Sequence, residues 1–177
     1  SGGELFLRKD LFTILEYARK SRFYIKLKTH GGLITEETAD KLAELGINRV
    51  DFSVYSLKDD VHDYITRRSG SLKKTMEGID RLIARNIPIR VNCSVMNLNT
   101  DCYKELFTHF TDRGIDASID GSIRGSNGGG IETYVLGLTL EEKIEMERFK
   151  REVLGTIPKP SAMDPEEHIC WAGKTSA

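Results

Sequence analysis

At 177 residues, with 39% hydrophobic and 30% charged side chains, the chain has the composition of one ordinary globular domain with a substantial core. Its formal net charge of -1 gives no electrostatic reason to expect nucleic acid or an anionic membrane surface as a partner. No apolar run is as long as a membrane span and no signal-peptide pattern is present, so we expect a cytoplasmic protein without membrane partners.

Helical and strand-like patterns alternate along the chain after the opening triplet Gly2-Gly3-Glu4. Apolar spacing predicts a first helix from Leu11 to about Ser21, and runs of β-branched and aromatic residues predict strands at residues 23–29, 49–55, 89–95 and 117–120. Later helices are expected to begin at Thr35, Ser71, Tyr103 and Thr139. Thr35 and Ser71 are expected as N-caps, and Thr139 with Glu142 forms a capping-box pattern.

This alternation predicts an α/β fold, because strands separated by helices of ten or more residues form βαβ units around a parallel sheet. The repeat length suits a barrel or a doubly wound sheet. No Gly-x-Gly-x-x-Gly follows the first strand and no Gly-x4-Gly-Lys-Ser/Thr is present, which disfavours dinucleotide and P-loop sites. The functional site is therefore expected at the carboxyl ends of the strands.

Polar and glycine residues follow every predicted strand. These strand ends comprise residues 2–4, 29–31, 53–56, 94–99 and 121–125. Loops must be polar in any case, but Asn92, Ser94 and Asn99 gather on and just after one strand, which indicates a functional mouth.

The three cysteines, Cys93, Cys102 and Cys170, are widely spaced and include no Cys-x-x-Cys pair. Neither a zinc knuckle nor a self-contained iron–sulfur motif is predicted from them. Cys93 and Cys102 are expected to be buried or half-buried free thiols.

Several short motifs stand in a fixed order along the chain. They are Gly2-Gly3-Glu4, Thr29-His30-Gly31, Ser53, His62-Asp63, Arg67, Gly70-Ser71-Leu72, Val95 to Asn99 and Cys170-Trp171-Ala172-Gly173. Their order and spacing resemble those of radical S-adenosylmethionine enzymes, with His30 standing where that family has asparagine. The last motif resembles the start of the SPASM extension, which binds auxiliary iron–sulfur clusters.

The resemblance implies a partial (β/α) barrel of radical SAM type, truncated at its N-terminal strands, over residues 1–157. Residues 158–177 would be a linker and the start of a SPASM-like extension. The parent protein would use a 4Fe-4S cluster to cleave S-adenosylmethionine (SAM). The 5′-deoxyadenosyl radical would then abstract hydrogen from a peptide or tetrapyrrole-type substrate.

The same resemblance assigns roles to individual residues. It places cofactor contacts at Gly2, Gly3, Glu4, His30, Ser53, Arg67, Asn92 and Val95, and an auxiliary-cluster ligand of the parent at Cys170. Glu4, with the two glycines, would meet the methionine ammonium. Arg67 would pair with the methionine carboxylate. Ser53, Asn92 and His30 would bond the ribose or carboxylate, and Val95 would lie near adenine.

The family's Cys-x3-Cys-x2-Cys motif is not in this sequence. We therefore expect an inactive fragment of an active parent, with neither cluster nor SAM bound to the fragment. The strand at residues 23–29 would lie at a sheet edge, which favours a strand-paired homodimer.

Two alternatives remain open from the sequence. One is a (β/α) barrel enzyme that uses Glu4, Asp51 or His62 for acid–base chemistry, marked by a strongly shifted pKa in the barrel mouth. The other is a non-catalytic interaction domain whose strand edge is the working surface.

Overall fold

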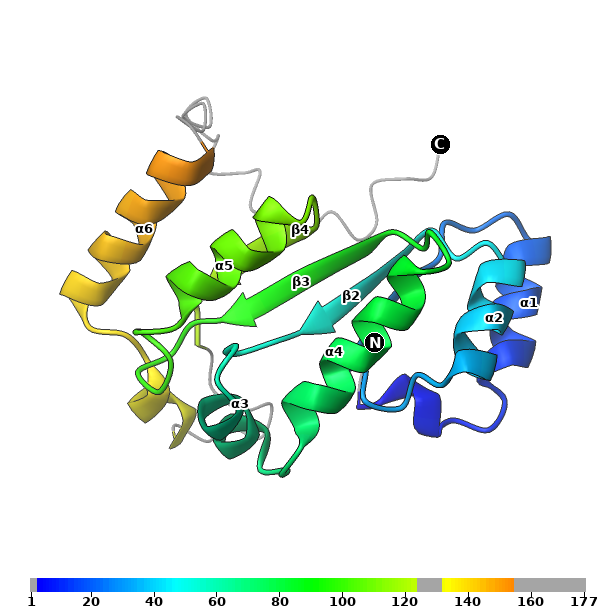
Figure 1. The fold of residues 1–177 in the computed structure, drawn as a ribbon, viewed down its shortest axis with the longest axis horizontal. Coiled ribbons are helices and arrows are strands. Elements are labelled where there is room, and N and C mark those ends of the chain that lie inside the picture. The colour runs from blue at the N-terminus through cyan, green and yellow to red at the C-terminus, as the bar shows by residue number, and fades with distance from the viewer. Residues whose placement is uncertain (1–2, 124–131, 155–177) are drawn as a thin grey trace, which may run out of the picture.

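Four parallel strands form one sheet, in the order β1-β2-β3-β4, in the computed structural model, which describes residues 3–123 and 132–154 (Figure 1). The strands are β1 (Lys26–Thr29), β2 (Arg49–Ser53), β3 (Ile89–Ser94) and β4 (Asp116–Asp120). The helices are α1 (Leu11–Lys20), α2 (Glu36–Glu44), α3 (Asp59–Thr66), α4 (Ser71–Ile83), α5 (Tyr103–Asp112) and α6 (Leu140–Leu154), with short 3-10 helices η1 (Leu5–Leu7) and η2 (Glu132–Leu136). The predicted α/β fold with a parallel sheet is confirmed. Gly2, Cys170 and the proposed extension at 158–177 lie outside the described residues.

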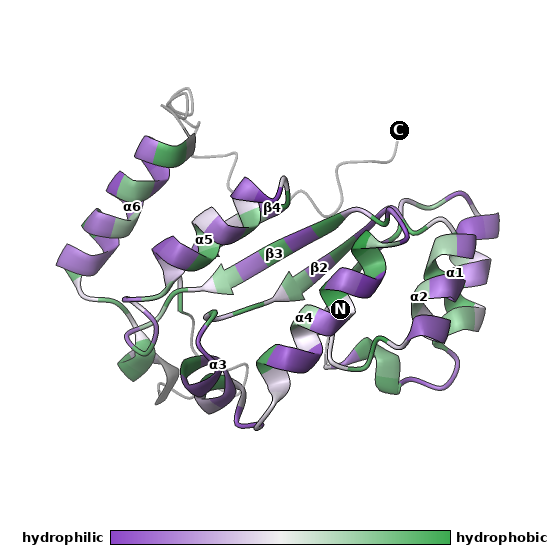
Figure 2. Cartoon of the chain, in the orientation of Figure 1, coloured by the Kyte–Doolittle hydropathy of each residue, from purple (hydrophilic) through white to green (hydrophobic). Residues whose placement is uncertain are grey.

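The two faces of the sheet differ in chemistry because side chains alternate along each strand. Leu27, Val50, Val91 and Ala117 are neighbours on one face, and their buried side chains contribute to the core. Figure 2 shows this alternation as green and purple bands along β2 and β3. The opposite face, which we call the polar face, consists of Lys26, Lys28, Arg49, Asp51, Ser53, Arg90, Asn92, Ser94, Asp116, Ser118 and Asp120.

Helices α4 and α5 lie across the apolar face of the sheet (Figure 1). Ile79 and Leu82 of α4, and Leu106 and Phe110 of α5, are completely buried in the core. Helix α6 lies beyond α5, where Phe149 packs edge-on against the ring of Phe107. Burial of these side chains fixes the helices to the sheet and so sets where the strand-end loops lie.

Ion pairs tie neighbouring strands together across the polar face, near the amino ends of the strands. Asp51, with only 4% of its side chain exposed, contacts Arg49 Nε at 2.8 Å and Lys26 Nζ at 3.8 Å. Arg90 Nε lies 3.2 Å from an oxygen of Asp116 on the next strand. Pairing lowers the cost of burying the Asp51 charge.

Two helix starts agree with the sequence pattern. Thr35 Oγ1 accepts the Thr38 N–H at 3.1 Å, which confirms the predicted cap of α2. Thr139 and Glu142 exchange side-chain to backbone hydrogen bonds of 2.7 and 3.2 Å, which confirms the capping box before α6.

Two local predictions were wrong, and one helix was missed. The first strand begins at Lys26 rather than residue 23, because Arg22 turns the chain with a φ of 61° and Phe23 and Tyr24 remain 62% and 69% exposed. Helix α3 was not predicted, since it is short and mostly polar. Ser71 does not cap α4: Gly70 holds the cap position with a φ of 71°, and the capping carboxylate is Asp63.

None of the helices that the structure describes is both long and apolar enough to cross a membrane.

Candidate functional site

Glu4 lies at the carboxyl end of β1, with only 8% of its side chain exposed. The chain reaches it through Gly3, whose φ of 60° suits glycine, and Glu4 then caps η1 by accepting the Phe6 N–H at 3.2 Å. The hydroxyl of Thr29 lies 2.8 and 2.9 Å from the two carboxylate oxygens. These contacts hold a largely buried carboxylate at one defined place beside the strand end.

His30 connects this carboxylate to the loop that follows β1. Its backbone N–H and its Nε2 both lie 3.1 Å from Glu4 Oε2, while its Nδ1 accepts the Gly32 N–H at 3.0 Å. An imidazole that accepts at Nδ1 carries its proton at Nε2, so the neutral ring donates to Glu4.

Close packing of this loop on α4 fixes the position of His30. Thr75 donates its hydroxyl to the His30 carbonyl at 2.7 Å. At Gly78 a Cβ would collide with the carbonyl oxygen of Gly31, and at Gly31 a Cβ would collide with the ring of Phe52. Two glycines therefore let the loop lie directly on the helix and the core.

His62 of α3 approaches from the end of β2. Its Nδ1 accepts the Tyr55 N–H at 3.2 Å, and the two rings lie 5.7 Å apart. The residue is 1% exposed, and burial lowers the pKa of its imidazole. His62 therefore presents a neutral ring with its proton at Nε2, and that N–H donates no hydrogen bond to a described residue.

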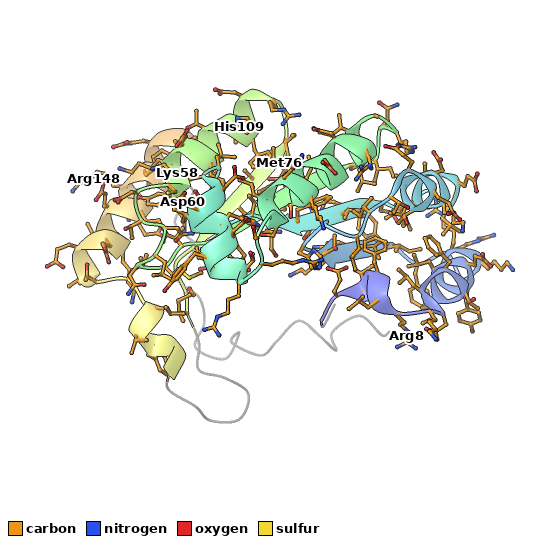
Figure 3. The ribbon with its side chains drawn as sticks, turned by 60° about the horizontal axis from the view of Figure 1, so that its bottom comes forward. Arg8, Lys58, Asp60, Met76, His109 and Arg148 are labelled. Carbon is orange, nitrogen blue, oxygen red and sulfur yellow. The ribbon has the colours of Figure 1, made fainter. Side chains whose placement is uncertain are left out.

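Asp63, the next residue, stabilises the turn between α3 and α4, which lie side by side (Figure 3, where Lys58 and Asp60 mark α3 and Met76 marks α4). Its carboxylate accepts hydrogen bonds from the Gly70 N–H, from the Ser71 hydroxyl at 2.8 Å and from the Leu72 N–H at 3.1 Å. The Leu72 N–H is the main reason that the pKa of Asp63 lies below its usual value. Asp63 thus has a structural role beside the site.

These side chains surround a cavity of about 490 Å³ at the carboxyl ends of β1 and β2. It is lined by Gly3, Glu4, Lys28, Thr29, His30, Ser53, Tyr55, His62, Ile65, Thr66, Arg68, Ser71 and Thr75. Four of the residues proposed from the sequence, Gly3, Glu4, His30 and Ser53, lie together in this lining.

Three other proposed residues lie elsewhere. Arg67 is exposed at the left-handed C-cap of α3, with a φ of 54°, and its neighbour Arg68 lines the cavity instead. Asn92 lies on the polar face outside the cavity lining. Val95 is completely buried, and its N–H donates to the Asp120 carbonyl at 2.8 Å.

Lys28 was missed in the sequence although a signal was present. It lies two residues before His30 on a strand, so the alternation of side chains places it on the polar face beneath the loop. Arg68 and Thr66 were missed because their placement depends on how α3 ends.

Asn99, which the sequence pattern marked as part of a functional mouth, is 1% exposed and fully bonded. Its Oδ1 accepts the Met96 N–H at 2.7 Å, and its Nδ2 donates to the carbonyls of Tyr55 at 2.8 Å and Ser94 at 3.2 Å. It stabilises the end of β3, and because it is buried and both of its N–H groups donate to carbonyls, it is not available to a ligand.

The thiols inside the described ranges are unsuited to metal binding. Cys93 and Cys102 are free and buried, as predicted, and burial raises the pKa of Cys93 to about 12. In residues 3–123 and 132–154 no three His, Cys, Asp or Glu side chains gather closely enough to hold a metal ion.

A family model for the radical SAM superfamily matches residues 1–110. The chain belongs to this superfamily. The cavity at the carboxyl ends of its parallel strands is where ligands bind in α/β folds of this kind.

Curated relatives and solved structures agree with this assignment. The chain is 31% identical over 101 residues to an AdoMet-dependent heme synthase of Methanosarcina barkeri, and 34% identical over 100 residues to a probable GTP 3′,8-cyclase of Methanocaldococcus jannaschii. These matches cover 57% and 56% of this chain, but only 29% and 33% of the relatives, so the chain spans about a third of their length. Streptococcus suis SuiB shares the fold, with a TM-score of 0.69 at 15% identity over 86% of this chain and 34% of SuiB.

Proposed function

We propose that this chain forms the SAM-binding part of a radical SAM oxidoreductase, and that the cavity beside Glu4 receives the methionine end of SAM. The observation that carries the proposal is the Glu4 carboxylate, 8% exposed and held by Thr29 and His30 at the end of β1. A fixed, dehydrated carboxylate is a strong partner for an ammonium group.

Other cavity residues would complete the contacts. The hydroxyl of Ser53 and the Nε2–H of His62 are available to ribose or carboxylate oxygens. Arg68, rather than Arg67, is the cavity arginine that could pair with the methionine carboxylate. A bond from Asn92 to the ribose or carboxylate, and a place near adenine for Val95, require a ligand that extends beyond the cavity along β3.

The bound cofactors would supply the radical chemistry: reductive cleavage of SAM at a 4Fe-4S cluster gives a 5′-deoxyadenosyl radical. The residues described here would bind and orient SAM and exclude water around it. We propose that the cluster ligands lie outside this sequence, since it contains no Cys-x3-Cys-x2-Cys. The chain alone is then inactive, and Cys170 would ligate an auxiliary SPASM cluster only in the complete protein.

For the substrate of the complete enzyme we propose only a broad chemical class. The heme synthase and cyclase relatives are named for a tetrapyrrole product and a nucleotide reaction, and SuiB has been solved with its precursor peptide SuiA. A peptide or tetrapyrrole-type substrate of the complete enzyme is consistent with these neighbours.

The test is SAM cleavage by the anaerobically reconstituted complete enzyme, followed as 5′-deoxyadenosine. Glu4→Gln removes the charge but keeps the shape. It should weaken SAM binding by roughly tenfold to a hundredfold, the usual worth of a hydrogen bond to a charged group.

Asp10→Asn is the matched control, because Asp10 is an exposed carboxylate that pairs with Arg8 outside the cavity. It should leave SAM binding unchanged. Absence of 5′-deoxyadenosine from the wild-type enzyme, or equal SAM affinity in Glu4→Gln and wild type, would contradict the proposal.

A further inference from the structure

Two cationic side chains, Lys28 and Arg68, line the cavity, and both are exposed to solvent. Neither of them, nor His62, has a side-chain acceptor among the residues that the structure describes. Glu4 is the single carboxylate among the described lining residues, and it already accepts from Phe6, Thr29 and His30.

Lys28 is unpaired for a reason visible in the sheet. Its register partner on β2 is Asp51, and opposite charges at such positions normally pair. Asp51, however, is taken by Arg49 at 2.8 Å and by Lys26 at 3.8 Å. The ammonium of Lys28 therefore has no carboxylate within ion-pair distance in the described part of the chain, and the residue lines the cavity instead.

The position of Lys28 separates it from the methionine end of SAM as we place it. Glu4 contacts the strand end at Thr29 and His30, whereas Lys28 lies one residue before Thr29 on the polar face, with an exposed side chain. SAM has a single carboxylate, and Arg68 is available to pair with it. Lys28 is therefore not needed to bind SAM. Beyond Lys28 the polar face continues through Asn92 and Ser118, which are uncharged and partly exposed.

We propose that Lys28 binds an anionic oxygen group of the substrate, a carboxylate or a phosphate, on the polar face beneath SAM. This inference rests on the proposed function, since it assumes that SAM fills the part of the cavity beside Glu4. It assigns the substrate to the anionic class and names the residue that selects it. A lysine ammonium suits such a group as a compact point charge with three donors.

The experiment measures anion binding by isothermal titration calorimetry on the complete enzyme at fixed ionic strength, with pyrophosphate and malonate as probes and SAM present at saturation. Lys28→Gln should weaken binding of at least one probe by about tenfold, the loss of one charge-assisted contact. SAM affinity should stay within about twofold of wild type. Lys28→Arg should retain most of the anion affinity.

Lys73→Gln is the control, since Lys73 is an exposed lysine of α4 outside the cavity lining, and it should change neither affinity. Unchanged anion affinity in Lys28→Gln would overturn the proposal. So would a loss of SAM affinity without a loss for 5′-methylthioadenosine, which lacks the amino-acid end, because Lys28 would then serve the SAM carboxylate. If wild type fails to bind SAM, the proposed function fails, while Lys28-dependent anion binding would still be measured in SAM-free buffer.

Discussion

The ends of β1 and β3 look alike in the sequence, because turn-forming polar or glycine residues follow each strand: His30-Gly31-Gly32 after β1, and Asn97, Asn99 and Thr100 after β3. In the structure they differ. After β1, the cavity keeps the donors of Lys28 and His62 without acceptors in the described chain. After β3, Asn99 uses its oxygen and its nitrogen on backbone groups of Met96, Tyr55 and Ser94.

The comparison teaches how a structural polar cluster is told from a binding one. A buried polar side chain whose bonds all go to backbone stabilises a loop, whereas one with a free donor beside a cavity is available to a ligand. Three predictions test this contrast through the stability of the protein. The first changes the polar cluster after β3, the second changes the support of the loop after β1, and the third changes a buried histidine of the cavity.

The largest effect is expected at Asn99. Asn99→Ala leaves the Met96 N–H and the Tyr55 carbonyl without their partner inside the protein, so the free energy of unfolding should fall by about 3 kcal/mol in urea denaturation. Asn97→Ala is the control, because Asn97 is exposed, and it should change stability by about 0.5 kcal/mol or less. An Asn99→Ala protein as stable as wild type would mean that Asn99 does not stabilise the end of β3, which would contradict the contrast with the end of β1.

A smaller effect is expected at Gly78, which supports the His30 loop. Replacing glycine by alanine inside a helix normally stabilises a protein by about 1 kcal/mol. At Gly78, however, the added Cβ would meet the carbonyl oxygen of Gly31. Overpacking against that carbonyl should instead destabilise Gly78→Ala by about 2 kcal/mol. The sign of the change in thermal and urea unfolding is the test, with Lys73→Ala on the same helix as the control, and a stabilised Gly78→Ala would show that the loop moves freely.

The smallest effect is a pH dependence at His62. The ordinary pKa of a histidine is 6.5, and burial lowers the pKa of His62 below this value in the folded protein. The neutral His62 therefore contributes its full stability above pH 6.5, and this contribution is lost as the pH falls through the lower pKa of the folded state. Unfolding free energies measured between about pH 7 and about pH 5 should therefore decline in wild type and decline less in His62→Gln. Equal slopes in wild type and His62→Gln would argue against a buried neutral His62.

Much of the fold could be predicted because its signals are local. Thr35 and the Thr139–Glu142 pair act within four residues of the chain, and the alternation of helices and strands determines a parallel sheet. The family motifs likewise placed Glu4, His30 and Ser53 at strand ends, and all three line the cavity.

The remaining features depend on contacts that no local pattern records. Which of Arg67 and Arg68 reaches the cavity is decided by the left-handed turn at Arg67. The bonding of Asn99 depends on the Tyr55 carbonyl, 44 residues away in the chain. The lack of a carboxylate partner for Lys28 in the described part of the chain depends on Arg49 and Lys26, which pair with Asp51 instead.

The position of β1 at the sheet edge has a consequence for self-association. Lys26 and Lys28 project from the same face of this four-residue strand. A second copy pairing along that edge would bring their ammonium groups close to its own, and like charges on facing strands repel. This repulsion would weaken the strand-paired homodimer that the sequence predicts, and that homodimer stays a prediction.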